Sequence, residues 1–308
     1  MIKFKNRRIL ITGSEGFLGR EVVRQLELKC DHVFGADPLK YDLRYNSHVI
    51  ELIQESQCDT IIHLAAAVGG IGANKANPGK FFYDNMQMGL NIMYQARAFG
   101  VSKVVNIGSS CIYPHDLEPP FKESDMWKGF PQEDVASYAM AKKMLLVMGQ
   151  GYRKQYGLNS IYLIPTNLYG QGDNFDLENG HVVASLIKKF SEGKGVVEVW
   201  GSGKASREFL YVEDCARAII MATEDYDKPD PINIGTGIET DMKTLVEMIR
   251  SFTNFKGVVT WNGTKPDGKP RCSLDVSKAW EEFGFKANIH LEEGLLQTIR
   301  WYKENYGK

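Results

Sequence analysis

The sequence has few cysteines, no long apolar run and almost no net charge, and each shortage excludes a class of protein. Its five cysteines are an odd number without a Cys-x-x-Cys pair, which predicts neither a disulfide framework nor a zinc site. No apolar run reaches the roughly 18 residues that span a bilayer, and Gly13 interrupts the first one too early for a secretory signal. The net charge of -1 offers no basic field for nucleic acid. We therefore expect a cytoplasmic protein that binds no metal, nucleic acid or membrane.

The first half of the chain shows a regular alternation of strand-like apolar runs and amphipathic helical stretches. This alternation predicts a doubly wound parallel α/β sheet, a Rossmann domain over residues 1–165. From about Thr166 the pattern becomes irregular and rich in glycine. We expect residues 166–308 to form mainly a smaller substrate-binding lobe, with a segment at about 208–238 rejoining the main sheet.

A glycine-rich turn, GSEGFLG at 13–19, follows the first strand pattern and opens a helix. Three glycines allow a tight turn and let the backbone approach a pyrophosphate at a helix N-terminus. Because the turn lies inside a strand–helix–strand unit, it predicts a dinucleotide site rather than an ordinary glycine turn. The residues expected to bind the cofactor here are Gly13, Ser14, Glu15, Gly16, Phe17, Leu18 and Gly19.

Asp37 ends the second strand pattern, 24 residues after the first of these glycines. An acidic side chain at this point accepts hydrogen bonds from the adenosine ribose and repels a 2′-phosphate. Glu15 adds a second negative charge, and neither position offers an arginine. The sequence therefore favours NAD(H) over NADP(H), although Lys40 or Arg44 could fold over a 2′-phosphate. Asp37 could also be a simple turn residue.

Tyr138 and Lys142 stand four residues apart in SYAMAK, where a helix places them on one face. A nearby ammonium favours the phenolate and lowers the pKa of tyrosine from about 10, and the same lysine can hold the nicotinamide ribose. Ser109, at the end of the preceding strand pattern, can hydrogen-bond the substrate oxygen. With the glycine turn, this set is typical of extended short-chain dehydrogenases/reductases, which polarise a carbonyl during hydride transfer. The alternative is a surface lysine beside a packing tyrosine.

A cysteine follows Ser109 by two residues in GSSCIYP, 108–114. On an extended chain, alternation puts Cys111 on the same side as Ser109, beside the carbon next to a bound carbonyl. A thiolate can remove the acidic proton of that carbon if a cation or dipole lowers the pKa of the thiol from about 8.5. An epimerase also needs an acid on the opposite face, and His181, with an ordinary pKa of about 6.5, is the candidate. Taken singly, the two could be a buried thiol and a helix cap.

Seven segments make the chain resemble the GDP-L-fucose synthases, the epimerase-reductases that act on GDP-4-keto-6-deoxy-D-mannose. They are HLAAAVGGI (63–71), GSSCIYP (108–114), SYAMAKK (137–143), PTNLYGQGDNFDLENGHV (165–182), VWGSGKASREFLYVED (199–214), INIGTG (232–237) and TKPDGKPR (264–271). The resemblance implies that Ser109, Tyr138 and Lys142 serve reduction, with NADPH as the usual cofactor. It also implies that Cys111 and His181 serve epimerisation at C3 and C5.

The resemblance implies further contacts and a homodimer. The additional cofactor contacts would be Leu64, Ala65, Ala66, Pro165, Asn167, Leu168 and His181, beside Tyr138 and Lys142. The contacts to a GDP-linked 4-keto-6-deoxy sugar would be Ser109, Ser110, Cys111, Asn167, Lys189, Trp200, Arg207 and Arg271. The dimer would form through the helices at about 81–99 and 137–156.

Departures from the family pattern leave other functions open. Glu15 and Asp37 stand where the synthases commonly carry arginines, and Cys272 stands where a lysine often follows TKPDGxPR. GDP-mannose 3,5-epimerases share an SxCIYP-like stretch and an acidic residue after the second strand, and they keep NAD bound. The alternative is therefore such an epimerase, or another NDP-sugar epimerase or 4-ketoreductase using NAD(H). A non-catalytic nucleotide sensor would tend to lose the tyrosine–lysine pair, which this chain retains.

Overall fold

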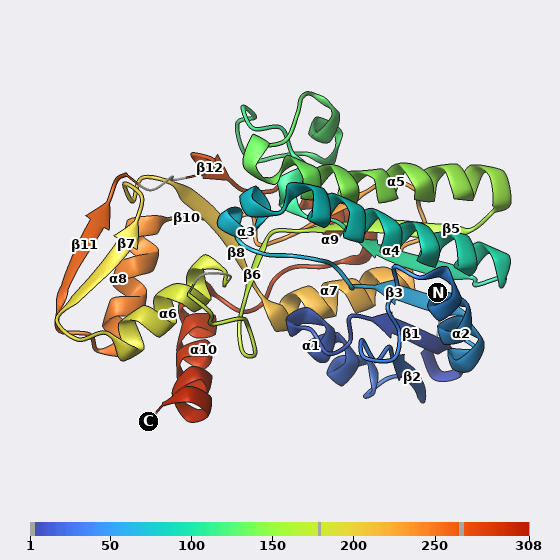
Figure 1. Ribbon diagram of the computed structural model, residues 1–308, viewed down its shortest axis with the longest axis horizontal. Helices are drawn as coiled ribbons and strands as arrows, with labels where there is room; N and C mark the ends of the chain where they lie inside the picture. Colours follow the sequence, from blue (N-terminus) through green and yellow to red (C-terminus); the bar gives the residue numbers. More distant parts are fainter. Residues whose placement is uncertain (1–3, 178–179, 265–267, 308) are drawn as a thin grey trace.

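The computed structural model describes residues 4–177, 180–264 and 268–307 (Figure 1). Residues 178–179 and 265–267, which belong to two segments of the resemblance, lie outside this description. The main sheet has parallel strands in the order β2-β1-β3-β4-β5-β9. Their bounds are β1 (Arg8–Thr12), β2 (His32–Gly35), β3 (Thr60–His63), β4 (Lys103–Ile107), β5 (Asn159–Pro165) and β9 (Ile232–Ile234).

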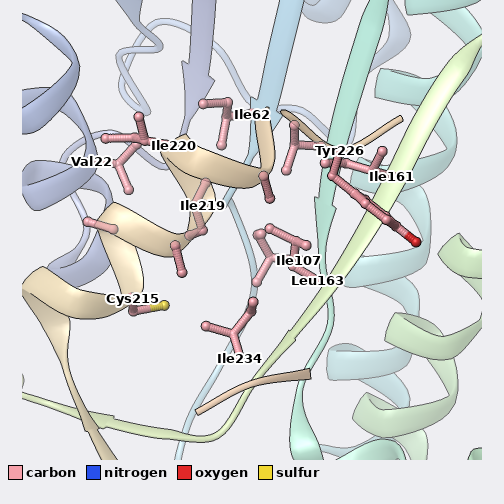
Figure 2. Close-up of a cluster of buried hydrophobic side chains, with 14 of the residues drawn as sticks. Val22, Ile62, Ile107, Ile161, Leu163, Cys215, Ile219, Ile220, Tyr226 and Ile234 are labelled. Atoms are coloured by element: carbon pink, nitrogen blue, oxygen red, sulfur yellow. The ribbon is translucent and has the colours of Figure 1, made fainter. Parts of the chain in front are cut away.

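Helices cover both faces of this sheet because its strands bury both sets of alternating side chains. Ile9 and Ile11 of β1 point into one core, with α1 and α7, while Leu10 between them points into another, with α2 and α4. Figure 2 shows the first core, where Ile219 and Ile220 of α7 meet sheet residues. The helices are α1 (Phe17–Leu26), α2 (Asn46–Ser56), α4 (Pro78–Ala98), α5 (Ala136–Tyr156) and α7 (Val212–Asp225). Each fully buried Ile or Leu contributes about 1.5–3 kcal/mol to this packing.

The second part of the chain builds two small sheets and a core of its own, on the left of Figure 1. In the first small sheet β8 pairs with β6, β10 and β12, and in the second β7 pairs with β11. The strands are β6 (Asn167–Tyr169), β7 (Val196–Trp200), β8 (Ser206–Tyr211), β10 (Glu239–Asp241), β11 (Val258–Asn262) and β12 (Arg271–Cys272). The helices around them are α6 (Val182–Glu192), α8 (Met242–Thr253) and α10 (Leu291–Tyr306).

The parallel doubly wound sheet agrees with the expected fold class, and the segment 208–238 divides between the two parts. β8 belongs to a small sheet, whereas α7 packs on α1 and β9 pairs with β5. The sequence patterns did not indicate the short helices or the C-terminal helix α10. The short ones are η1 (Phe4–Asn6), α3 (Ile71–Ala76), η2 (Ser110–Ile112), η3 (Glu123–Trp127), η4 (Glu133–Val135) and α9 (Ser277–Phe283). Within the described ranges, every helix is too short or too polar to cross a bilayer.

Candidate active site

Most of the predicted site residues gather at the carboxyl edge of the main sheet. β1 and β3 are neighbours in the sheet although β2 separates them in the sequence, so the strand order reverses between them. Such a switch point leaves a crevice in which doubly wound proteins bind ligands. The glycine turn follows β1, residues 64–66 follow β3, residues 109–111 follow β4, and residues 165–168 continue from β5 into β6.

The glycine turn is held by backbone packing that side chains would prevent. Gly13 has a φ of 69°, and a Cβ built on it would lie 2.7 Å from the backbone nitrogen of Ala65. A Cβ on Gly19 would lie 1.9 Å from the Gly13 oxygen, so α1 packs directly on the turn. The N-cap, Gly16, provides no capping side chain, and the first N–H groups of α1 remain available to an anion. These features fit the pyrophosphate of a dinucleotide.

Asp37 lies on the exposed turn after β2, where one of its carboxylate oxygens accepts a hydrogen bond from the Leu39 N–H at 2.8 Å. This bond is what a simple turn residue would make, so a turn role and a ribose-binding role are both compatible with the geometry. Both nearby cations are already engaged by carboxylates. Lys40 lies 2.5 Å from Glu55, and Arg44 lies 2.6 Å from Asp42 and 3.3 Å from Asp84.

Tyr138 and Lys142 lie in the first two turns of α5, where Lys142 is buried and Tyr138 is half-buried. Burial lowers the pKa of Lys142 to about 8, which leaves the ammonium mostly charged at neutral pH. Burial, and then the nearby Cys111 thiol, raises the pKa of Tyr138, while the adjacent Ser109 hydroxyl acts in the opposite direction. The expectation of a lowered tyrosine pKa is therefore wrong, because desolvation outweighs the stabilisation of the phenolate. Tyr138 is held as a phenol that can donate its proton.

His63, the last residue of β3, is buried near Lys142. Its Nδ1 lies 2.8 Å from the Oγ1 of Thr12 on the adjacent strand. Burial, followed by the Lys142 ammonium, lowers the pKa of His63 to about 3, so the imidazole is neutral. The Tyr162 hydroxyl of β5 donates to the Lys142 carbonyl at 2.8 Å and fastens α5 to the sheet.

Cys111 lies on η2, a single 3-10 turn, and the assumption of an extended chain after Ser109 is wrong. The Cys111 N–H donates to the Ser109 Oγ at 3.3 Å, and this turn brings the thiol back beside Ser109 and Tyr138. The Ser109 and Cys111 side chains therefore lie together. The cause is the capping hydrogen bond of the 3-10 turn, not the alternation of side chains along a strand. Burial raises the pKa of Cys111, whereas the Ser109 hydroxyl, the Arg207 guanidinium and the Lys269 ammonium act to lower it.

His181 is the N-cap of α6 and lies exposed at the entrance to that helix. Its carbonyl accepts the Ser185 N–H at 2.9 Å. Gly180, directly before it, lies beside Gly70 of the loop after β3, since a Cβ on Gly70 would be 3.7 Å from the Gly180 oxygen. Desolvation by the surrounding chain lowers the pKa of His181. These contacts place the backbone just before His181 beside the start of α3, and the approach of His181 to Cys111 across a bound sugar stays a prediction.

An aromatic cluster on α10 anchors the loop that leads to His181. Phe175 is buried, and its ring centroid lies 4.7 Å from that of Tyr302 and 5.9 Å from those of Trp301 and Tyr306. One residue later, the Asp176 carbonyl accepts the N–H of Gly180, the residue before His181, at 2.9 Å. The fixed point of the loop therefore comes from the far end of the chain.

Of the remaining substrate candidates, Asn167 and Trp200 lie on strands β6 and β7, and Lys189 lies on α6. Lys189 donates to the Glu198 carbonyl at 3.0 Å and lies 5.5 Å from the ring centroid of Trp200, which is 56% exposed. Asn167 donates to the Glu208 carbonyl at 2.9 Å.

The two arginine candidates of this set have different surroundings. Arg207 is half-buried on β8 and donates to the Ser206 carbonyl at 2.7 Å. Arg271 is exposed and paired with Glu239 at 2.7 Å and Glu118 at 3.7 Å. Arg207 therefore lies close to the reacting groups, and Arg271 is held at the rim by carboxylates.

Lys269 joins the site although no sequence pattern pointed to it. Its Nζ donates to the Pro114 carbonyl at 2.5 Å and lies 4.0 Å from the ring centroid of Phe121. The available signal was the segment TKPDGKPR itself, whose second lysine falls three residues before Cys272. Among the described residues, no three His, Cys, Asp or Glu side chains gather as metal ligands would.

The model of the NAD dependent epimerase/dehydratase family matches residues 9–235. The chain belongs to this family. The GDP-L-fucose synthase of Escherichia coli (strain K12) is 36% identical over 313 residues, which cover 97% of this chain and 97% of that protein. As a member of the NAD dependent epimerase/dehydratase family, the chain is an enzyme that uses a nicotinamide dinucleotide.

Two solved structures show the same fold over nearly the whole chain. A GDP-6-OMe-4-keto-L-xylo-heptose reductase from C. jejuni is 28% identical with a TM-score of 0.92, and the match covers 99% of each chain. A GDP-L-fucose synthetase from Naegleria fowleri bound to NADP is 28% identical with a TM-score of 0.89, covering 98% of this chain and 95% of that one. The predicted α/β fold class and the NAD(P) cofactor are confirmed.

Proposed function

We propose that this enzyme epimerises GDP-4-keto-6-deoxy-D-mannose, or a close analogue, at C3 and C5 and then reduces C4 to give a GDP-L-fucose type product. The observation that carries the proposal is the placement of the Cys111 thiol beside the Tyr138 phenol and the Ser109 hydroxyl. A plain ketoreductase needs the phenol but has no use for a thiol there. The E. coli relative, named a GDP-L-fucose synthase, supports the choice of sugar nucleotide.

The isomerising half of the proposed reaction uses Cys111 and His181. The Cys111 thiolate removes a proton from the carbon next to the C4 ketone, and the negative charge spreads onto the ketone oxygen as an enolate. The His181 imidazolium returns a proton to the opposite face of that carbon. The diphosphate of the substrate brings negative charge that favours the imidazolium, against the desolvation that lowers the pKa of His181. Exchange with solvent water then removes the proton from the Cys111 thiol and returns one to the His181 imidazole, and the same step at the second carbon completes the epimerisation.

The reductive half uses Ser109, which follows β4, and Tyr138 and Lys142 of α5. Residues 13–19, Asp37, Leu64, Ala65, Ala66, Pro165, Asn167 and Leu168 would hold the dinucleotide, with Lys142 on its nicotinamide ribose. When bound, NAD(P)H supplies the hydride for C4. Ser109 donates a hydrogen bond to the C4 oxygen, and Tyr138 gives that oxygen its proton. Tyr138 is protonated at neutral pH, and the Lys142 ammonium one turn along α5 favours release of its proton as negative charge develops on the C4 oxygen.

The sugar nucleotide would lie between the sheet edge and the small sheets. Arg207 is suited to the diphosphate because a guanidinium forms paired, charge-assisted hydrogen bonds. The exposed face of Trp200, with Lys189 beside it, is suited to a flat base. Ser110 and Asn167 would contact the sugar, and Arg271 would reach it only by leaving Glu239.

We also propose a cytoplasmic homodimer with a Rossmann domain over 1–165 and a substrate lobe over 166–308. Apolar side chains lie exposed on the two long helices, including Tyr83 at 60% and Tyr94 at 51% on α4 and Val147 at 45% on α5. A second copy would cover these faces. Sedimentation equilibrium tests this, because Tyr94→Glu together with Val147→Glu should yield a monomer. A wild-type protein that sediments as a monomer at all concentrations contradicts the dimer.

The decisive experiment follows deuterium and product separately. The protein is incubated with GDP-4-keto-6-deoxymannose in heavy water, first without and then with NADH or NADPH. We expect deuterium at C3 and C5 without reduced cofactor, and oxidation of the added cofactor afterwards. Cys111→Ala should lose the exchange by about a hundredfold or more while its fold and nucleotide binding persist. Absence of exchange in the wild-type protein would overturn the epimerase half, and absence of cofactor oxidation would overturn the reductase half.

A second candidate, a GDP-mannose 3,5-epimerase-like enzyme, is favoured by the acidic Glu15 and Asp37. Such an enzyme would act on GDP-mannose itself and return the hydride within one catalytic cycle. Incubation with GDP-mannose and NAD distinguishes the two, because only this candidate exchanges deuterium into that substrate. The identity of the nucleotide that copurifies with the protein gives independent evidence on which of the two candidates is correct.

A further inference from the structure

Lys269 places a positive charge over the loop that carries the reactive thiol. Its Nζ donates to the carbonyl of Pro114, three residues after Cys111, at 2.5 Å, and lies 4.0 Å from the ring centroid of Phe121. The side chain is half-buried, and desolvation lowers the pKa of Lys269. Two fixed contacts therefore hold an ammonium that a surface lysine would leave free in water.

The titratable and charged groups around the thiol come from several elements. Tyr138 of α5 and Cys272 of β12 are neutral acids beside it, and Arg207 of β8 and Lys269 are the cations. Asp116 and Cys272 in turn face Lys269. Burial raises the pKa of Cys111, while Arg207 and Lys269 both lower it. A buried thiol needs such cations if a useful fraction is to be thiolate near neutral pH.

The two cations do not serve the thiol equally once the substrate is bound. Arg207 is the proposed partner of the diphosphate, and an anion on its guanidinium weakens its effect on Cys111. Lys269 is tied to a carbonyl and a ring, so its charge stays directed at the thiol loop. Lys269 lies three residues before Cys272 on the same segment, and Cys272 also lies beside the Cys111 thiol.

We propose that Lys269 is a positioning residue that favours the ionised form of the Cys111 thiol and keeps it aimed at the sugar during epimerisation. The inference rests on the proposed function to explain why Cys111 should be ionised. The effect of the Lys269 charge on Cys111 does not depend on that function. The loop carrying Cys111 and the segment carrying Lys269 meet whether or not a sugar is bound. No step of the reaction passes a proton through Lys269.

Site-resolved alkylation tests the proposal without any substrate. The folded protein is treated with iodoacetamide over a range of pH, and mass spectrometry of the peptide that contains Cys111 gives the rate at each pH. Lys269→Gln keeps a donor for the Pro114 carbonyl but removes the charge, and Lys269→Arg keeps the charge. Lys286→Met is the matched control, since it removes an exposed lysine from a different part of the chain.

We expect Lys269→Gln to raise the apparent pKa of Cys111 by about one, and to slow alkylation at neutral pH about tenfold. Lys269→Arg and Lys286→Met should follow the wild-type profile. An unchanged profile in Lys269→Gln, with an unchanged thermal melt, overturns the proposal. A Lys269→Arg profile as slow as that of Lys269→Gln also overturns it. The shape of the side chain at position 269, and not its charge, would then determine the alkylation rate of Cys111.

Deuterium exchange separates this inference from the proposed function. If both hold, Lys269→Gln loses about tenfold in exchange at C3 and C5 at neutral pH and recovers as the pH rises. If the wild-type protein shows no exchange while the alkylation profiles differ as expected, the proposed function fails and the charge effect of Lys269 stands. If exchange is present and indifferent to Lys269, the inference fails alone.

Discussion

Ser109, Tyr138 and Lys142 come from the end of one strand and the start of one helix, whereas Cys111, His181 and Lys269 come from three separate irregular segments. In the proposed reductive group Lys142 is buried and Ser109 and Tyr138 are half-buried, and Tyr162 of β5 fastens α5 to the sheet. The isomerising group depends on a 3-10 turn, a loop held by Phe175 and a lysine that reaches back to Pro114. Rigid elements fix geometry through many contacts, while loops depend on a few anchors. The two activities should therefore fail separately.

The largest expected effect is on the reductive group alone. Tyr138→Phe removes the proton donor, and we expect C4 reduction to fall by about 10²–10⁴-fold in single-turnover assays. Deuterium exchange at C3 and C5 should stay within a few-fold of wild type, because Cys111 and His181 are unchanged. Reduction at the wild-type rate would remove Tyr138 from the mechanism, and loss of both activities would show that the two groups are not separable.

The opposite pattern, loss of epimerisation with cofactor binding retained, is expected when the ring contacts of Phe175 are weakened. Phe175→Leu loosens the contact with Tyr302 and Tyr306, and we expect exchange at C3 and C5 to fall about ten- to a hundredfold through misplacement of His181. NADH binding should be unaffected, as read from its fluorescence titration. Trp280→Leu, at an exposed aromatic on α9, is the control. Equal exchange rates in the two variants would mean that the loop needs no anchor.

The pH dependence of reduction should report the buried lysine. Because burial lowers the pKa of Lys142 to about 8, its ammonium is lost as the pH rises through that value. We expect kcat/KM for reduction to fall about tenfold per pH unit above that point. Lys142→Arg should move the fall to higher pH, since a guanidinium stays charged. A profile that is flat to pH values well above 8 contradicts a role for the charge.

The same pKa affects the stability of the fold in a definite direction. Between about 8 and the ordinary value of 10.5, the unfolded chain holds a proton that the folded protein has lost at Lys142. This group therefore makes the free energy of unfolding rise with pH in that window. Urea unfolding of wild type and Lys142→Met at two pH values inside and below the window isolates the contribution.

The smallest expected effect concerns the cofactor. We propose a preference for NAD(H), and Asp37→Asn should shift the ratio of the two dissociation constants toward NADPH by about fivefold, as expected for one exposed charge. Asp31→Asn, an exposed aspartate before β2, is the control. The readout is the fluorescence of bound NADH and NADPH. A wild-type protein that already prefers NADPH would contradict the role assigned to Asp37.

Regular spacing made the fold and the reductive group predictable. The strand and helix alternation gave the sheet, and the four-residue spacing of Tyr138 and Lys142 gave a shared helix face. The pKa of Tyr138 was not predictable, because the direction depends on how deeply the phenol is buried. Cys111 was placed beside Ser109 for the wrong reason, since no pattern showed that the chain turns at Ser110.

The least predictable parts bring together residues from distant segments of the chain. Lys269 meets Pro114 across 155 positions, and Phe175 meets an α10 cluster that no sequence pattern had marked. Such contacts arise from the packing of the small sheets, and the hydrophobic periodicity of the sequence does not indicate them. The resemblance located His181, but the loop that holds it became visible only in three dimensions.

The dependence of Phe175 on α10 has a practical consequence for anyone purifying this enzyme. Tyr306, the last residue of α10, belongs to the ring cluster against Phe175. A preparation in which proteolysis has damaged this turn of α10 should keep its dinucleotide site while losing the contact that holds Phe175. Such a preparation would be mistaken for a simple reductase, so the integrity of this turn should be verified by intact mass before any isomerase measurement is believed.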